Sequence, residues 1–292
     1  MSKSWGTMKR EAEQRLASRR NLMIVDGTNL GFRFKKDSGK PIAASFANTI
    51  NSLANSYDAK HTIVLGDKGK SIFRTNIFPE YKGNRDAKYA DRSAAEVEAD
   101  RQFFEYLDDA FDLIASQFPT FRIRGVEADD MAAFIIQLIG QHYDHIWLIS
   151  TDGDWDTLLA PNISRFSFTT RKEYHEKDMF DNHNVDTVDQ FISLKAIMGD
   201  MGDNIRGVEG IGEKRGYNLI REHGSVLDII DALPLPGTQK FVQALNKSGE
   251  LMERNLTLVD LPSFCGEAVA AAGQDIYDQF VKDIMAIAAG EV

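Results

Sequence analysis

The chain has 292 residues, 43% hydrophobic and 27% charged, and is long enough to bury the core of one large domain or two modest ones. Its net charge of −10 argues at first against a nucleic-acid partner, because phosphate backbones are bound by lysine and arginine. No apolar run reaches the length of a membrane span and the start resembles no signal peptide, so we expect a cytoplasmic protein with no membrane contact. One cysteine, Cys265, excludes an internal disulfide and a thiolate zinc cage.

Residues 1–20 are polar and partly basic, and we expect them to form a solvated helix or arm. The apolar run 22–25 then leads into Asp26 and Gly27, which predicts a buried strand followed by a sharp turn. A second strand is predicted at 62–65, after a helix at 43–57, and it closes with Gly66 and Asp67. An acid at the carboxyl end of an inner strand occupies a position typical of ligand sites.

The composition changes between residues 68 and 92, where basic residues alternate with aromatic ones. Such a mixture suits single-stranded or frayed nucleic acid, because cations meet phosphates and rings stack on bases. A long solvated loop is the alternative. The residues concerned are Lys68, Lys70, Phe73, Arg74, Phe78, Tyr81, Lys82, Arg85, Lys88, Tyr89 and Arg92.

An acidic stretch, Glu127, Ala128, Asp129 and Asp130, follows a predicted helix at 96–117 and a predicted strand at 121–123, and it opens an apolar helix. One anion at a helix N-terminus is ordinary capping, which leaves a capped and solvated helix start as the alternative. Three carboxylates within four residues repel one another, so a cation is expected among them. A divalent metal ion is the obvious candidate.

A further strand is predicted at 145–150, and it delivers Asp152 and Asp154 at its carboxyl end. Alternating strands and helices predict an α/β fold with a mostly parallel central sheet flanked by helices, whose ligand site lies at the carboxyl edge of the strands. The strand-end acids would meet there. Asp156, Asp181 and Asp189 are expected to be cap or surface acids.

The chain from residue 186 onward is predicted to be mostly helical. A helix over 191–198 ends near Gly199, and Asp200 and Asp203 would share a face if a helical turn continued there. The glycine-rich stretch 207–216 permits a tight turn whose N–H groups could approach a phosphate. Further helices are predicted at 226–233, 238–247 and 274–289, with breaks at Pro234, Pro236 and Pro262.

Taken in order, these motifs resemble the 5′ nuclease family, which includes flap endonucleases, phage 5′-exonucleases and polymerase-associated 5′ nuclease domains. The stand-alone phage type is most similar in length. The resemblance covers roughly residues 20–260 and implies a basic arm (1–20), an α/β nuclease core (21–185) with a helical arch (68–118), and a helical DNA-binding region (186–292) with a helix-three-turn-helix element. The motifs are Asp26-Gly27, Asp67, Tyr81 to Arg85, Glu127 to Asp130, Asp152 to Asp154, Gly199 to Asn204, and Gly207 to Gly216.

The resemblance implies a nuclease that cuts DNA at 5′ flaps, frayed 5′ ends or single-strand/duplex junctions and also acts as a 5′-3′ exonuclease. Two Mg²⁺ ions, or Mn²⁺ in their place, would act without a covalent intermediate and leave 5′-phosphate and 3′-hydroxyl products. Setting the ligand acids aside brings the net charge close to neutrality, so the acidic balance no longer excludes DNA. The first metal pocket would be Asp26, Asp67, Glu127, Asp129 and Asp130, and the second Asp152, Asp154, Asp200 and Asp203.

Other roles also follow from the resemblance alone. Lys82 and Arg85 would contact the phosphate being cut, where their charge offsets developing negative charge. Tyr81 would stack on a base, and Arg33 would touch DNA near the site. The 207–216 element would hold duplex DNA by its backbone and bind K⁺ through main-chain carbonyls. The carbonyls would be those of Val208 and Ile211, and the further DNA contacts Lys195, Gly210, Gly212, Lys214 and Arg215.

Two alternatives were weighed against this monomeric nuclease. A PIN-type ribonuclease shares strand-end acids, but such proteins are usually shorter and lack a glycine-rich phosphate loop. A non-catalytic DNA-binding module is disfavoured because no matching acid is replaced and Lys82 and Arg85 are both present. The balance of endonuclease and exonuclease action, activity on RNA, and the split between direct and water-mediated ligands stay open.

Overall fold

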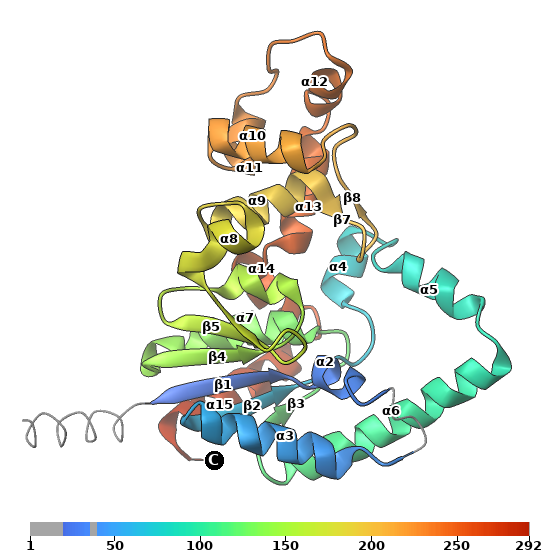
Figure 1. Cartoon of the computed structure of the whole chain (residues 1–292), viewed down its shortest axis with the longest axis vertical. Helices are drawn as coiled ribbons and strands as arrows, with labels where there is room; N and C mark the ends of the chain where they lie inside the picture. The colour runs from blue at the N-terminus through green and yellow to red at the C-terminus, as the bar shows by residue number, and fades with distance from the viewer. Residues whose placement is uncertain (1–19, 36–39, 292) are drawn as a thin grey trace, which may run out of the picture.

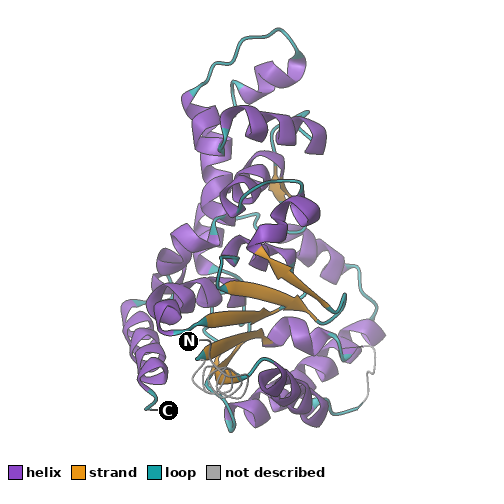
Figure 2. Ribbon diagram, turned by 60° about the vertical axis from the view of Figure 1, so that its left-hand side comes forward, coloured by secondary structure: helices purple, strands orange, loops and turns teal. Residues whose placement is uncertain are grey.

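The computed structural model describes residues 20–35 and 40–291, so nearly all of the arm expected at 1–20 lies outside the described residues. A six-stranded sheet forms one layer between helices in the lower part of the molecule (Figures 1 and 2). Its order is β3-β2-β1-β4-β5-β6; β5 and β6 pair antiparallel and the other pairs are parallel. The strands are β1 (Asn21–Asp26), β2 (Ala59–Leu65), β3 (Thr120–Phe121), β4 (His145–Ile149), β5 (Ile163–Ser167) and β6 (Lys172–His175).

Strand β1 lies in the middle of the sheet, and all six of its residues are buried. Such a continuous buried run is typical of a parallel strand covered on both faces. Leu22 and Ile24 pack against α7 (Ala128–Ile139), α14 (Leu261–Ala270) and α15 (Gln274–Ala289). Met23 and Val25 point to the other face, against α3 (Ala43–Ser56) and α6 (Ala94–Ala115). The predicted doubly covered α/β sheet is therefore confirmed.

The predicted helical arch corresponds to three helices, α4 (Ile72–Ile77), α5 (Gly83–Ala90) and α6. In Figure 1, α5 leads away from α4 at the right of the molecule and α6 returns to the sheet beside α3. A capping box fixes the start of α6, since the Ser93 side chain accepts from the Glu96 N–H and the Glu96 carboxylate accepts from the Ser93 N–H. Helix α6 thus begins two residues before the predicted start.

A second hydrophobic core holds the helical region in the upper part of Figure 1. Ile197, Ile220, Ile229 and Met252 are all buried in it. Its helices are α8 (Met179–His183), α9 (Val188–Met198), α10 (Glu213–His223), α11 (Val226–Asp231), α12 (Lys240–Leu245) and α13 (Gly249–Val259). The predicted helices are confirmed here, while α13 was not predicted.

The helix α9 ends before Gly199 as predicted. The helical turn on which a shared face of Asp200 and Asp203 depended is not formed, because the chain makes a hairpin of β7 (Gly199–Asp200) and β8 (Ile205–Arg206) there. Pro262 does not break a helix but lies in the first turn of α14, where its missing N–H costs nothing. Helices α14 and α15 pack on α7 beside the sheet, and the assignment of 186–292 to one DNA-binding region stays a prediction.

Strands β5 and β6 were also not predicted.

Among the described residues, no helix combines the length and apolar character needed to cross a membrane.

Candidate metal centre

A cavity of about 180 Å³ opens at the carboxyl edge of the sheet. Three strands deliver side chains to it: β1 ends in Asp26, β2 is followed by Asp67, and β4 is followed by Asp152 and the 3₁₀ helix η3 (Gly153–Leu158). The convergence expected from the parallel topology is therefore observed. Seven of the nine proposed metal-binding carboxylates line the cavity: Asp26, Asp67, Glu127, Asp129, Asp152, Asp154 and Asp203.

Asp26 caps the helix α2 (Gly27–Phe32) and is 6% exposed. Its Oδ1 accepts from the Asn29 N–H at 2.9 Å, and its Oδ2 accepts from the Ser150 hydroxyl at 3.0 Å. Burial and the neighbouring carboxylates of Asp67 and Asp152 raise the pKa of Asp26 to about 8 despite these donors. A metal ion beside it would supply the positive charge that keeps this carboxylate ionised at neutral pH.

Asp67 is the second residue after the end of β2. Its Oδ1 accepts from the Ala128 N–H at 2.8 Å, at the N-terminus of α7, and its own N–H donates to the Thr28 hydroxyl at 2.9 Å. Burial raises the pKa of Asp67, and Glu127 adds repulsion. These two hydrogen bonds hold together the segments at Thr28, Asp67 and Ala128, which are distant in sequence.

The acidic stretch at the start of α7 offers one carboxylate oxygen from each of Glu127, Asp129 and Asp130 within 4.8 Å of one another. Burial raises the pKa of Asp129 well above its ordinary value, and Asp130 and Glu127 add repulsion. For Glu127, burial opposes ionisation, but Lys82 and Arg74 outweigh it and lower its pKa. The stretch therefore fits a cation better than it fits a plain helix cap.

Asp130 is held by Arg74, which the sequence placed only among the basic residues of the 68–92 segment. The two terminal guanidinium nitrogens of Arg74 lie 2.5 and 2.9 Å from Oδ2 and Oδ1 of Asp130, and one of them also lies 3.1 Å from Glu127. Arg74 is 3% exposed and also donates to the Leu258 carbonyl. Both oxygens of Asp130 face this arginine and Asp130 does not line the cavity, so its place in the first metal pocket stays a prediction.

Lys195 lies within the second group of acids. Its ammonium contacts Asp154 and lies 2.9 Å from Asp200 Oδ2, and its side chain is 13% exposed. Burial disfavours the ammonium, but Asp154 and Asp200 raise the pKa of Lys195 above its ordinary value. Without DNA the charge of Lys195 is paired with these carboxylates, and its expected contact with DNA stays a prediction.

Asp200 and Asp203 meet in the β7–β8 hairpin and not on a helix. The Asp200 Oδ1 accepts from the Gly202 N–H at 2.8 Å and closes the turn. The hairpin needs glycine at both ends: Gly199 has φ of +76°, and a Cβ on Gly207 would lie 2.1 Å from the Met198 carbonyl group. The turn brings Asp203 next to the arch.

Asp203 contacts three arch residues. Its Oδ1 lies 2.7 Å from Arg85, its Oδ2 accepts from the Tyr81 hydroxyl at 2.8 Å, and Lys82 Nζ lies 3.6 Å away. Lys82 also lies 2.5 Å from Glu127 Oε1. Lys82 and Arg85 line the same cavity as the seven carboxylates, and their contact with the substrate stays a prediction.

Tyr81 differs from expectation. Its side chain is 2% exposed, and its hydroxyl also donates to Glu127 at 2.9 Å. The ring has no face open to a base, so the expected stacking role is corrected to a buried support for Glu127 and Asp203. Arg33, at the end of α2, lies 5.9 Å from the Phe168 ring centroid and does not line the cavity.

The glycine-rich stretch is a turn that leads into α10. Gly210 has φ of +77°, and the Val208 carbonyl accepts from the Ile211 N–H at 3.0 Å. Gly212 is the N-cap of α10, and Arg215 donates to the Gly210 carbonyl at 2.5 Å and stacks on Phe241. Lys214 is exposed. Exposed cations and a free helix N-terminus suit a phosphate backbone.

Asp156 is not the cap or surface acid that was expected. It is fully buried, with Arg165 at 2.6 and 2.8 Å and His183 Nε2 at 2.8 Å from its oxygens. Burial favours the neutral form, but the hydrogen bonds from His183 and Arg165 lower its pKa. Arg165 also donates to the Ser150 carbonyl at 3.1 Å, so this cluster supports the turn that carries Asp152 and Asp154. Asp181 and Asp189 are exposed as expected.

The residues 21–187 match the family model of the 5′-3′ exonuclease N-terminal, resolvase-like domain, and residues 187–265 match that of the 5′-3′ exonuclease C-terminal SAM fold. The chain is 70% identical over 289 residues to the flap endonuclease of Escherichia phage T5, covering 99% of each protein. It is 27% identical over 246 residues to DNA polymerase I of Bacillus caldotenax, which covers 80% of this chain and 27% of the polymerase.

Two solved structures at 70% identity have the same fold. One is a T5 D15 flap endonuclease variant in a pseudo-enzyme-product complex with DNA and metal ions, with a TM-score of 0.90 over 92% of this chain and 100% of the other. The second is T5 5′-exonuclease with bound zinc ions, with the same TM-score and coverage. With both family models matched, the chain belongs to the 5′-3′ exonuclease family.

Proposed function

We propose that this chain is a structure-specific 5′ nuclease that hydrolyses DNA at 5′ flaps, frayed 5′ ends and single-strand/duplex junctions, both as a flap endonuclease and as a 5′-3′ exonuclease. The observation that carries the proposal is the cavity in which Asp26, Asp67 and Asp203 face Lys82 and Arg85. Carboxylates suit hard divalent cations, and the two cations suit a phosphodiester. The metal-bound and DNA-bound relatives support this reading.

The donor set fits Mg²⁺, with Mn²⁺ as a substitute, because every candidate ligand is a carboxylate oxygen and the pKa of Asp26 is raised to about 8 without a cation. When bound, two such ions supply an activated water and a stabilised leaving oxygen. Asp26, Asp67, Glu127 and Asp129 would hold one, and Asp152, Asp154, Asp200 and Asp203 the other. Asp130 supports the first group through Arg74.

The chain's own residues position and neutralise the substrate. Lys82 begins α5 with φ of +55°, and its ammonium reaches Glu127 and Asp203 at the border of the cavity. A phosphodiester at that border would exchange places with these carboxylates as the partner of Lys82 and Arg85. Both cations then offset negative charge as it develops on the phosphate oxygens. Products would carry a 5′-phosphate and a 3′-hydroxyl.

The helical region would hold the duplex without reading bases. Lys214 and Arg215 are exposed beside Gly210 and Gly212 at the start of α10, which suits contacts to sugar and phosphate. K⁺ bound by the carbonyls of Val208 and Ile211 would add charge at this turn. We propose that the protein acts as a monomer in the cytoplasm, which for a phage protein is that of the host.

Incubation with a 5′-labelled flap duplex tests the proposal. With Mg²⁺ we expect cleavage near the flap junction and products with a 3′-hydroxyl, and with EDTA we expect none. A fully paired, blunt duplex of the same sequence is the matched control and should be cut more slowly. Cleavage that ignores the junction, or that proceeds equally with EDTA, would contradict the proposal.

A further inference from the structure

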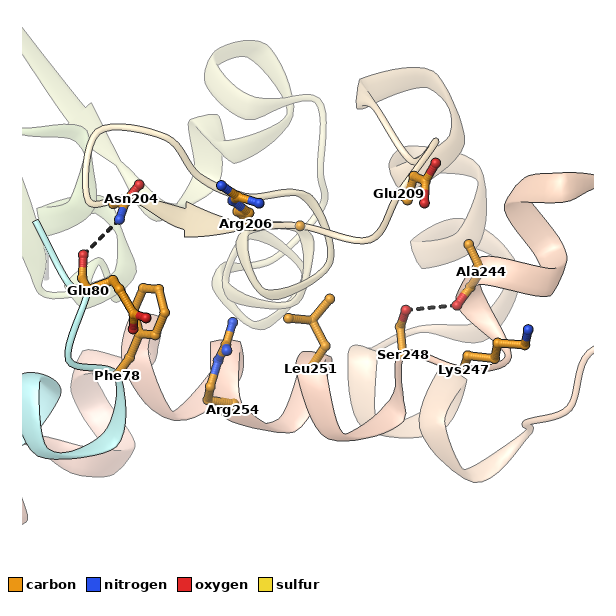
Figure 3. Close-up of a pocket in the computed structure, with 11 residues that line it drawn as sticks. Phe78, Glu80, Asn204, Arg206, Glu209, Ala244, Lys247, Ser248, Leu251 and Arg254 are labelled. Atoms are coloured by element: carbon orange, nitrogen blue, oxygen red, sulfur yellow. Dashed lines mark hydrogen bonds between the residues drawn. The ribbon is translucent and has the colours of Figure 1, made fainter. Parts of the chain in front are cut away.

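A second pocket, of about 650 Å³, is lined by Asn204, the neighbour in sequence of Asp203, which lines the metal-centre cavity. It is lined by the β7–β8 hairpin on one side and by α12 and α13 on the other, with the end of α4 closing one end (Figure 3). Asn204 follows Asp203 directly, and its side chain donates to the Glu80 carbonyl at 2.8 Å, two residues before Lys82. The pocket and the metal centre therefore occupy opposite sides of one turn.

Three cations line this pocket: Arg206 on β8, Lys247 after α12, and Arg254 on α13. None of them has a carboxylate partner within the part of the chain that the structure describes. The Nε of Arg254 is buried and lacks any hydrogen-bond acceptor, although its guanidinium stacks on Phe78 at 4.6 Å. A buried donor without a partner is costly, so an acceptor that reaches it, from water or from a phosphate, would stabilise this arginine.

Hydrogen bonds within the protein fix the distance between the two walls of this pocket. Asn255 is fully buried, and its amide donates to the Arg206 carbonyl at 2.8 Å and to the Ala196 carbonyl at 3.0 Å. Its carbonyl oxygen accepts from Arg254 at 3.0 Å. One side chain thus sets the spacing between the strand that carries Arg206 and the helix that carries Arg254, so the cationic pocket is preformed.

The pocket continues toward the glycine-rich turn. Glu209, Ala244 and Lys247 line both this pocket and the adjacent one, which also contains Arg215 and Lys240. Basic side chains therefore form a line that runs from the metal centre past the β7–β8 hairpin to the start of α10. Such a line suits a polymer of phosphates better than a single small anion, and the volume far exceeds that of one phosphate group.

We propose that this pocket binds a phosphodiester of the DNA substrate between the cleavage site and the glycine-rich turn, with Arg206 and Arg254 as its ligands. Leu251 and Phe78 offer apolar surface to the adjoining sugar. Glu80 and Glu209 line the two ends of the pocket in Figure 3 and confine the phosphate to its middle. The proposal rests on the nuclease function proposed above, since it assigns one more contact to the same substrate.

The test is flap-duplex binding measured by fluorescence anisotropy in Ca²⁺, at several salt concentrations, for wild type, Arg206→Ala and Arg254→Gln. We expect each variant to lose affinity for DNA several-fold. The plot of the logarithm of the association constant against the logarithm of the salt concentration should become shallower by about 0.9, the value for one phosphate contact. Lys282→Ala, which removes an exposed charge on α15, is the matched control and should leave both unchanged. Arg254→Lys should restore most of the slope.

The single-turnover cleavage rate at sub-saturating enzyme should fall several-fold in Arg206→Ala, in line with its loss of affinity, and should stay at the wild-type value in Lys282→Ala. Arg206 is exposed, so its loss leaves the core intact. If Arg206→Ala binds DNA with the affinity and salt slope of Lys282→Ala, the inference is overturned while the nuclease function stands. If wild type itself fails to bind the flap duplex, the proposed function fails first.

Discussion

Arg74 holds Asp130 through both carboxylate oxygens, at 2.5 and 2.9 Å, with neither side chain more than 4% exposed. This pair joins the base of the arch to the start of α7 and lies directly behind Glu127 and Asp129. Two members of the acidic stretch thereby remain for a metal ion, while the third is anchored. The arginine is a positioning residue for the metal centre.

Arg74→Ala should lower the free energy of unfolding by about 3–5 kcal/mol, because it leaves the buried carboxylate of Asp130 unpaired. Urea unfolding without metal measures this loss. Arg101→Ala is the matched control, since Arg101 pairs with Glu98 and Glu105 on the exposed face of α6, where solvent screens such pairs and their loss costs far less. Equal losses in the two variants would contradict the anchoring role.

Asp26 makes the metal-free protein sensitive to pH. Its pKa is about 8 in the folded state against 3.8 for an ordinary aspartate, so the folded state binds an extra proton between these values and stability falls as pH rises, by about 1.4 kcal/mol per pH unit. Asp67, Asp129 and Asp154 have raised pKa values and act in the same sense. Thermal melts with EDTA should show Tm falling from pH 5 to pH 8.

Asp26→Asn should flatten that slope, and saturating Mg²⁺ should raise the wild-type Tm most at pH 8, where protons compete least. The comparison with Asp181→Asn, an exposed acid on α8, separates the effect from a general change in charge. A wild-type melt that is unaffected by Mg²⁺ at pH 8 would count against a metal centre built on these acids.

The strand-end acids were predictable because each depends on a local pattern, an apolar run followed by an acid, and on the rule that parallel strands share a carboxyl edge. Asp26, Asp67 and Asp152 met as expected for that reason. The partner of Asp130 was not predictable, since Arg74 lies 56 residues away and is one of seven cations in its segment. The packing of α4 on α13 and α14 is what places Arg74, among these cations, beside Asp130.

The hairpin at Asp200 and Asp203 was not predicted, because a spacing of three residues fits a helical turn and a hairpin alike. The choice is made by backbone contacts that no local pattern contains, namely the approach of Gly207 to the Met198 carbonyl group. Asp156 was read as a surface acid because its partners come from β5 and α8, neither of which had an apolar signal strong enough to place it. Tertiary pairing decided both cases.

Lys82→Ala should lower the single-turnover cleavage rate by about 10²–10³ and change DNA affinity far less, since the ammonium acts on charge that develops at the phosphate. Lys82 Nζ lies 2.5 Å from Glu127, so the variant also leaves Glu127 with fewer positive neighbours and should weaken Mg²⁺ binding slightly. Rates measured at several Mg²⁺ concentrations separate the two effects. Equal losses of rate and affinity would refute the catalytic role.

Asp156→Asn should destabilise the fold by about 3 kcal/mol or more, because Arg165 is 3% exposed and would lose its buried counter-charge. Arg165 also holds the Ser150 carbonyl, and Ser150 donates to Asp26, so Mg²⁺ affinity should fall as well. Urea unfolding and calorimetric Mg²⁺ titration check the two effects. Asp189→Asn, which changes an exposed acid, is expected to stay within about 0.5 kcal/mol of wild type.

Replacing both Asp200 and Asp203 with Asn should abolish cleavage and leave flap-selective binding in Ca²⁺ intact. Asp200 shares Lys195 with Asp154, and Asp203 lines the cavity beside Lys82 and Arg85, so the double variant removes two negative charges from one side of the metal centre. Asn preserves the shape of the turn, since its side-chain oxygen can still accept from the Gly202 N–H. Gel-shift binding and single-turnover cleavage of the same substrate measure the two properties. A double variant that cuts at the wild-type rate would remove both residues from the metal centre.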